Sequence, residues 1–266
     1  MIVEGTPQMI PALSQIWAAC FGDGPDYIRF FMEKRFPTCR CFVWVEHEHP
    51  VGAIYLLPCH LKQRPVLYAY AGGVLPQNRK HGGFSALVER SAQACQEIGA
   101  SLILVPAPGT EEYYQKRGFQ TAFSYRTLEL DGNGKLVPAV FREAQAAEYA
   151  RLRDLSFAQL PYLQWGVEAI EYALAENRFC GGFGEIMTLE QDYLLFGRRD
   201  GDVLELLEST LDLDTAKQIA PTLCRRWGAR QMRIRLPVKD SKGGTPSGSI
   251  LGQATFSDGW LGLNLL

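Results

Sequence analysis

The chain has 266 residues, which exceeds one ordinary compact domain of roughly 100–200 residues and suits two. Apolar residues make up 47% and charged residues 21%, a composition typical of globular domains that bury a core. The formal net charge of −2 gives no electrostatic reason to expect a nucleic acid as the main partner, and no apolar run is long enough to span a membrane.

The first part of the chain predicts a strand, a pair of helices and an antiparallel meander. Apolar residues recur at helical spacing up to Gly22, and Pro25 suits the first turn of a second helix. Three β-branched and aromatic runs then follow, separated by short polar turns. We expect a strand at residues 2–4, helices at 10–21 and 25–36, and strands at 41–46, 51–61 and 65–74.

A strand–loop–helix–strand unit follows the meander. The polar loop at residues 77–83 contains glycine, and the next helix has one apolar face and closes at Gly99. Residues 101–105 are almost wholly apolar, as expected of a strand covered on both faces. We therefore expect parallel strands joined by a right-handed crossover, then a short helix at 111–116 and a strand ending at 130.

Residues 131–135, Asp-Gly-Asn-Gly-Lys, form the clearest linker in the chain. Beyond it the order of helix, helix, three strands, helix and strand repeats that of the first part, without a repeat at the level of residues. We therefore predict two domains, residues 1–131 and 132–266, the second a divergent copy. Its expected elements are helices at 144–156, 167–176 and 215–227, strands at 185–189, 193–196, 203–208 and 232–236, a mobile loop at 239–252 and a terminal strand at 260–266.

The loop after residue 74 has the features of an anion site. A helix start presents unpaired N–H groups and a partial positive charge, which favour phosphate. Gly82 and Gly83 remove side chains where a backbone would approach an anion, and Arg79, Lys80 and His81 add basic groups at the same place. The sequence predicts a phosphate-containing ligand here.

At this loop the chain resembles the GNAT acetyltransferase family, whose signature is V-x-P-x-x-R-x-x-G-x-G/A. Val74, Pro76, Arg79 and Gly82 match the signature in register, whereas Phe84 stands at its last glycine or alanine. The Eis-type branch, which carries two tandem GNAT domains, tolerates a bulky apolar residue there, so Phe84 points to that branch.

A second family motif, Y-x-x-x-G-F, is matched by residues 114–119, and the resemblance covers residues 1 to about 130. It implies an α/β (α+β) fold, a mixed sheet flanked by helices, in two tandem GNAT-like domains. It also implies acetyl-CoA as cofactor. The binding residues that follow from it are Gly72, Gly73, Val74, Arg79, Lys80, His81, Gly82, Gly83, Phe84 and Ser85.

In the family, the strand that here ends at Gly72, Gly73 and Val74 pairs with the pantetheine and polarises the acetyl carbonyl through backbone N–H groups. A plain bulge in a splayed strand explains the two glycines equally well. Tyr114 is the catalytic candidate, because a phenol can protonate a departing thiolate. A packing tyrosine is the alternative.

No general base can be assigned, because the stretch Tyr68-Ala69-Tyr70-Ala71 lacks the glutamate that many family members carry there. A water chain, a tyrosine or a group from the second domain could serve instead. His60 receives no role. The fragment His47-Glu48-His49 lies at an expected hairpin turn without further ligands, so we predict no metal site.

The corresponding loop of the second domain, residues 209–214, contains Asp212 and Asp214 instead of basic residues and glycine. Carboxylates there would repel pyrophosphate, so we expect this domain to bind no CoA and to serve the acceptor site or the structure. Further acids beside the preceding strand suggest an acidic surface that attracts a cationic amine: Asp200, Asp202, Glu205 and Glu208. A solvated acidic surface without this function is the alternative.

The resemblance predicts an acetyl-CoA-dependent N-acetyltransferase acting on a small-molecule or peptide amine by direct attack in a ternary complex. A CoA-binding module without catalysis is the alternative. An esterase-like hydrolase, suggested by residues 81–84, lacks a G-x-S-x-G elbow. The 7 cysteines without a C-x-x-C pair, and an N-terminus without signal-peptide features, favour the cytoplasm. The sequence leaves open whether the chain forms a homo-oligomer.

Overall fold

The computed structural model describes residues 1–238, 244–252 and 256–263. The chain forms two compact units that are not contiguous in sequence. Residues 1–121 and 248–255 make unit 1, and residues 122–247 and 256–266 make unit 2. These limits differ from a single boundary at residue 131, because each unit takes a short segment from the other half of the sequence. No helix in the described part of the chain combines the length and apolar character that a membrane span requires.

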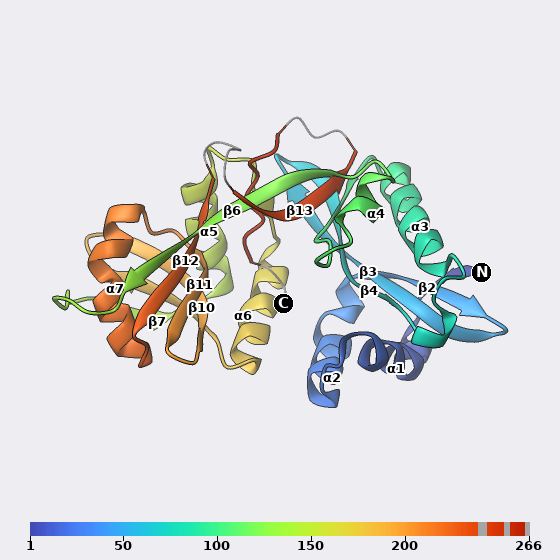
Figure 1. The fold of residues 1–266 in the computed structure, drawn as a ribbon, viewed down its shortest axis with the longest axis horizontal. Coiled ribbons are helices and arrows are strands. Elements are labelled where there is room, and N and C mark those ends of the chain that lie inside the picture. Colours follow the sequence, from blue (N-terminus) through green and yellow to red (C-terminus); the bar gives the residue numbers. More distant parts are fainter. Residues whose placement is uncertain (239–243, 253–255, 264–266) are drawn as a thin grey trace. The chain divides into compact units, whose positions relative to one another are not determined.

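Unit 1 is a mixed sheet with helices on both faces (Figure 1). Its strands are β1 (Ile2–Glu4), β2 (Arg40–Glu46), β3 (His49–Leu61), β4 (Arg64–Val74), β5 (Ser101–Leu104) and part of β13 (Thr245–Leu251). Its α-helices are α1 (Ile10–Phe21), α2 (Pro25–Lys34), α3 (Gly83–Glu97) and α4 (Glu111–Gln115). The predicted strand–helix–helix–meander order and the crossover helix are all present.

The strand order of unit 1 is β1-β2-β3-β4-β5-β13. β1 to β4 pair antiparallel, β4 and β5 pair parallel, and β13 pairs antiparallel with β5. The hairpins turn at His47-Glu48 and at Lys62-Gln63, all with positive φ, as two-residue type I′ turns require.

Two separate aromatic and aliphatic cores hold the helices of unit 1 to its sheet. On one face, Leu87 and Val88 of α3 pack with residues such as Ile54 and Leu56 of β3. On the other face, Trp17 of α1 contacts Tyr55 at 5.4 Å between ring centroids. Neighbouring strand residues point to opposite faces, so burial of both sides explains the continuous apolar runs of the central strands.

Unit 2 repeats this order of elements. β7 (Val140–Glu143) is followed by the helices α5 (Ala146–Phe157) and α6 (Val167–Phe179), with the two-residue β8 (Leu163–Gln164) between them. Then come β9 (Phe183–Thr188), β10 (Asp192–Asp200), β11 (Val203–Ser209), α7 (Leu213–Trp227) and β12 (Gln231–Pro237). The sheet order is β7-β9-β10-β11-β12-β6, in which β11 and β12 are parallel.

The sixth strand of each sheet comes from the other half of the sequence. β6 (Gln120–Asp131) follows the elements of unit 1, but its residues 125–131 pair with β12. β13 follows the elements of unit 2, but Ser249, Ile250 and Leu251 pair with β5. This exchange explains why the compact units cannot be separated at one position.

Two predictions near the C-terminus were wrong. Residues 245–251, expected in a mobile loop because of their Gly and Ser content, form β13, where pairing with β5 overrides the loop composition. Residues 260–263, expected in a strand, form only an isolated bridge between Tyr162 and Trp260. The rest of both predicted segments, residues 239–243 and 264–266, lies outside the described residues.

Candidate active site

The strands β4 and β5 diverge at the site that the sequence singles out. Their parallel pairing ends at Ala69 and Leu104, whereas β4 continues to Val74. Beyond that pair, β4 carries a bulge opposite Ile54, and Ala71 in this bulge has a left-handed φ of 47°. A strand end that has lost its neighbour offers backbone N–H and C=O groups to a ligand. Gly72, predicted to lie in a bulge or in the ligand slot, is part of this bulge, and Gly73 pairs with Ala53 directly after it.

Gly72 and Gly73 bring two helices close to the β4 backbone. A methyl group on Gly73 would lie 2.8 Å from Cys20 Sγ at the end of α1, and one on Gly72 would lie 3.1 Å from Phe84 Cε2 in α3. Phe84, the residue that departs from the family signature, therefore occupies space that the missing side chain of Gly72 leaves free.

The loop between β4 and α3 is tied to the sheet at its start and open at its end. Arg79 Nε donates to the carbonyl of Val74 at 3.1 Å, and Asn78 Nδ2 donates to Glu46 at 2.6 Å. Burial raises the pKa of the Cys20 thiol, and a hydrogen bond with Arg79 opposes that rise. Arg79, Lys80 and His81 are exposed, so the loop presents its basic residues to solvent.

The first turn of α3 can receive an anion. Its N-cap, Gly82, has a φ of 81° and supplies no side-chain cap, and nothing lies within 4 Å of the position a Cβ would take. The amide of Ala86 bonds to the carbonyl of Gly82, so the amides of residues 83–85 precede the first intrahelical bond. Gly83 has a different function, because a Cβ there would meet the Trp44 ring at 1.9 Å. The helix start is therefore packed on β2 by Gly83 and left open by Gly82.

A polar cluster beside this helix start escaped the sequence analysis, which named Ser85 but neither of its partners. The Ser85 hydroxyl lies 2.9 Å from Tyr113 Oη and accepts from Arg117 Nη2 at 3.0 Å. The Arg117 guanidinium also stacks on the Tyr113 ring, 3.6 Å from its centroid. Tyr113 lies directly before the Y-x-x-x-G-F motif and Arg117 lies within it, so this motif was the sequence feature that could have indicated the cluster.

Tyr114 is largely buried beside this cluster. It packs edge-on against Tyr113, at 5.0 Å between centroids, and against Phe119 at 5.6 Å. Burial raises the pKa of Tyr114 to about 12; Tyr113 adds to the rise and Arg117 opposes it. The phenol therefore keeps its proton throughout the physiological pH range, as a donor must.

The remaining histidines of the first half stay outside the site. His47 and His49 are exposed at the β2–β3 hairpin, and His60 is exposed on β3. No group of metal-binding side chains occurs within the described ranges. The general base that the sequence left unassigned gains no candidate, since Tyr70 faces α2, with its hydroxyl 3.0 Å from that of Tyr27.

Unit 2 has the same strand divergence but a different helix start. The parallel pairing of β11 and β12 ends at Leu206 and Ile234, and β11 continues to Ser209. The Asp212 carboxylate then caps α7 by accepting from the amides of Asp214 and Thr215 at 3.0 and 2.9 Å. These bonds lower the pKa of Asp212. A carboxylate of the chain already occupies the position of an anion here.

The acidic surface expected on unit 2 is largely neutralised. Glu205 pairs with Arg198 and Arg233, and Asp202 pairs with Arg230. Glu208 is fully buried and pairs with Arg153 at 3.0 Å. Asp202, Glu205 and Glu208 therefore have arginine partners, whereas Asp212 and Asp214 remain exposed.

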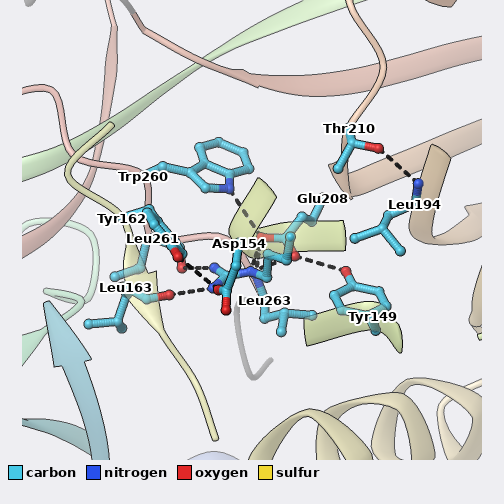
Figure 2. A network of polar contacts seen from close by, with 11 residues as sticks. Tyr149, Asp154, Tyr162, Leu163, Leu194, Glu208, Thr210, Trp260, Leu261 and Leu263 are labelled. Atoms are coloured by element: carbon cyan, nitrogen blue, oxygen red, sulfur yellow. Dashed lines mark hydrogen bonds and ion pairs between the residues drawn. The ribbon is translucent and has the colours of Figure 1, made fainter. Parts of the chain in front are cut away.

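Figure 2 shows that Glu208 holds the C-terminal segment to unit 2. Its carboxylate accepts from Trp260 Nε1 at 3.1 Å, from the Leu263 amide at 3.2 Å and from Tyr149 Oη at 2.8 Å. Arg153 donates to the carbonyl of Leu261 at 3.3 Å. The end of β11 is therefore covered by the C-terminal segment. The corresponding strand end in unit 1 is that of β4.

Comparisons with known proteins agree with this geometry. Residues 2–122 match the family described as "Acetyltransferase (GNAT) domain". No curated protein matches the sequence. A probable N-acyltransferase of unknown function from Enterococcus faecalis V583 shares the fold at a TM-score of 0.74 and 13% identity, covering 94% of this chain and 72% of that one.

Two further solved structures are also similar over nearly the whole chain. Eis1 from Mycobacterium abscessus has a TM-score of 0.66 at 12% identity, covering 94% of this chain and 73% of its own. A tandem GNAT protein from the clavulanic acid biosynthesis pathway has a TM-score of 0.55 at 12% identity, covering 96% and 99%. Residues 2–122 therefore match a GNAT acetyltransferase domain, and Eis and tandem GNAT proteins are among the structural neighbours of the chain.

Proposed function

We propose that the chain is an acetyl-CoA-dependent N-acetyltransferase that acetylates an amine by direct attack in a ternary complex. One observation carries the proposal: the uncapped start of α3, with Gly82 open to solvent, follows a basic loop at the end of a diverging strand. Backbone N–H groups and basic side chains arranged in this way suit a pyrophosphate.

Acetyl-CoA would supply an activated acetyl thioester. The amides of Gly83, Phe84 and Ser85, with Arg79, Lys80 and His81, would hold its pyrophosphate, and Gly72, Gly73 and Val74 would pair with its pantetheine. The close approach of α1 and α3 to the two glycines supports this assignment, because both helices then pack tightly against β4 where β4 has separated from β5.

We assign Tyr114 Oη the proton that the leaving sulfur requires. A phenol with a pKa of about 12 is a weak acid beside a thiol of pKa about 8.5, so full transfer of its proton is uphill. Its contribution would come mainly from a hydrogen bond to the developing thiolate, which strengthens as charge builds on sulfur.

The second half, residues 132–266, would bind no acetyl-CoA and serve the acceptor or the structure. The Asp212 cap supports this, since it fills the equivalent helix start of unit 2 with a carboxylate. We also propose a cytoplasmic location, supported by seven free cysteines, of which four are buried.

The test is release of the CoA thiol from acetyl-CoA over a panel that includes polyamines, aminoglycosides, amino acids and peptide amines. We expect release that depends on an amine and is lost in Gly82→Asp. Tight acetyl-CoA binding without amine-dependent release would instead favour a non-catalytic module, which the missing carboxylate on β4 makes the second candidate.

A further inference from the structure

Unit 2 contains a cavity of about 430 Å³ at the start of α7, where β11 and β12 have separated. Its walls come from the ends of β11 and β12, from β6 and from the end of α5. The volume lies within the range of about 300–1,000 Å³ that is usual for small-molecule sites. By topology, this position corresponds to the strand–helix junction that carries the proposed cofactor loop in unit 1.

Acetyl-CoA does not suit this cavity. The Asp212 carboxylate already accepts the free amides of the α7 start and would repel a pyrophosphate. The neighbouring end of β11 is also taken, because Glu208 binds the segment at Trp260 and Leu263. The cavity therefore suits a ligand that carries no pyrophosphate.

Two polar groups of the cavity lack partners. Ser209 is 1% exposed, and its Oγ has no hydrogen-bond partner among the residues that the structure describes. A buried hydroxyl without a partner is unfavourable, so a ligand that accepts or donates a hydrogen bond there gains affinity. The Arg126 side chain, on β6, makes no ion pair in the described part of the chain, although Asp212 and Asp214 also line the cavity.

The other lining side chains are mostly apolar. Phe157 and Leu160 come from the end of α5 and the turn after it, and Leu211 comes from the loop before α7. The cavity therefore offers an apolar interior with a guanidinium and carboxylates among its lining groups. Asp214 is almost fully exposed and 4.0 Å from Lys217, so its carboxylate stays accessible.

We propose that this cavity binds a small zwitterionic amino compound with an apolar side chain, such as an apolar α-amino acid. Arg126 would bind its carboxylate, Asp214 would bind its ammonium group, and Phe157, Leu160 and Leu211 would enclose its side chain. Ser209 would supply a further hydrogen bond. The proposal does not depend on acetyl transfer, because the site lies wholly within unit 2.

The test is titration calorimetry of the full chain, without acetyl-CoA, against L-leucine, L-methionine and L-phenylalanine. For the amino acid that binds best, its decarboxylated amine and its deaminated acid are titrated too. We expect both analogues to bind at least about 10-fold more weakly, since each loses one charge-assisted contact. No binding by any of the three amino acids, or equal binding by either analogue, would overturn the proposal.

Variants locate the site. Arg126→Met should weaken amino-acid binding about 10-fold or more, and Leu160→Trp, which fills the cavity from its partly exposed rim, should abolish it. Gly82→Asp, in unit 1, should leave it unchanged, so failure of the acetyl-CoA proposal can be distinguished. Circular dichroism and thermal unfolding check that each variant folds. Undiminished binding in folded Leu160→Trp would place the ligand elsewhere and refute the assignment.

Discussion

The two units have the same order of strands and helices, but the corresponding helix starts are basic and uncapped in one unit and acidic and capped in the other. In each, a parallel strand pair separates after four paired positions and a 15-residue helix starts beside the gap. In unit 1 that helix starts at a bare glycine with φ of 81°, after three exposed basic residues. In unit 2 it starts at Asp212, whose carboxylate makes the bonds that an anionic ligand would otherwise make.

The difference shows that one residue at a helix start can decide whether that start is able to receive a phosphate. The N-cap residue alone changes the helix start from an open donor site to one that is satisfied and negatively charged. The strand ends differ in the same sense. Near its end β4 has two glycines that admit close neighbours, whereas β11 has Glu208, whose carboxylate accepts a hydrogen bond from Trp260.

The largest effect should follow from breaking that anchor. Arg153→Met leaves Glu208 as a buried, uncompensated charge, so we expect unit 2 to lose about 3–5 kcal/mol of stability. Chemical denaturation followed by tryptophan fluorescence measures the loss. The matched control is Arg230→Met, which removes an exposed pair with Asp202 and should change stability little. Equal effects of the two variants would show that the buried network is not what holds unit 2 together.

Gly82→Asp should place a negative charge at the α3 start, as Asp212 does at the α7 start. The left-handed backbone of residue 82 does not suit a capping side chain, but the new carboxylate would repel the pyrophosphate, so acetyl-CoA affinity should fall about 100-fold or more. Gly82→Asn is the control, because asparagine accepts positive φ and adds no charge. Calorimetry compares the two variants. A similar loss in Gly82→Asn would assign the effect to backbone geometry rather than charge.

Tyr114→Phe should lower turnover about 10- to 100-fold with little change in acetyl-CoA affinity, because the ring stays and only the donor is lost. A folded-state pKa of about 12, above the unfolded value of about 10, means that the stabilisation by the buried neutral phenol is present below pH 10 and lost as pH rises towards 12. Turnover should therefore show no loss below pH 10 that depends on Tyr114.

Tyr113→Phe is the matched control, since it removes the hydroxyl beside Ser85 and keeps the ring under Arg117. We expect it to alter acetyl-CoA affinity more than turnover. If Tyr113→Phe lowered turnover as much as Tyr114→Phe, the adjacent tyrosine would be the better candidate for the donor.

The smallest effect concerns the departure from the family signature. Gly72→Ala would press a methyl group against the Phe84 ring and Ile54, so acetyl-CoA affinity should fall only a few-fold. Phe84→Ala should restore the space and relieve the loss in the double variant, which a double-mutant cycle measures. Additive effects would show that the two residues do not share this space.

Local patterns predicted most elements because propensity, turn residues and burial agree along the meanders and crossover helices. The strand ending near residue 130 was predicted, but the exchange of strands was not, since the pairing of β6 with β12 and of β13 with β5 depends on contacts far apart in sequence. The Gly and Ser content of β13 concealed it further. At the site, the loop from Arg79 to Gly83 was visible as a motif, but the Ser85–Tyr113–Arg117 cluster and the neutralised acids of unit 2 depend on side-chain geometry that no pattern records.

The most direct measurement is the stoichiometry of acetyl-CoA binding to the full chain by titration calorimetry, repeated on Gly82→Asp and Asp212→Ala. If the open helix start of unit 1 forms the cofactor site, the wild-type chain binds one acetyl-CoA, Gly82→Asp binds none, and Asp212→Ala still binds one with similar affinity. Two sites in the wild-type chain, or a single site that survives Gly82→Asp and is changed by Asp212→Ala, would contradict the assignment of the cofactor to unit 1.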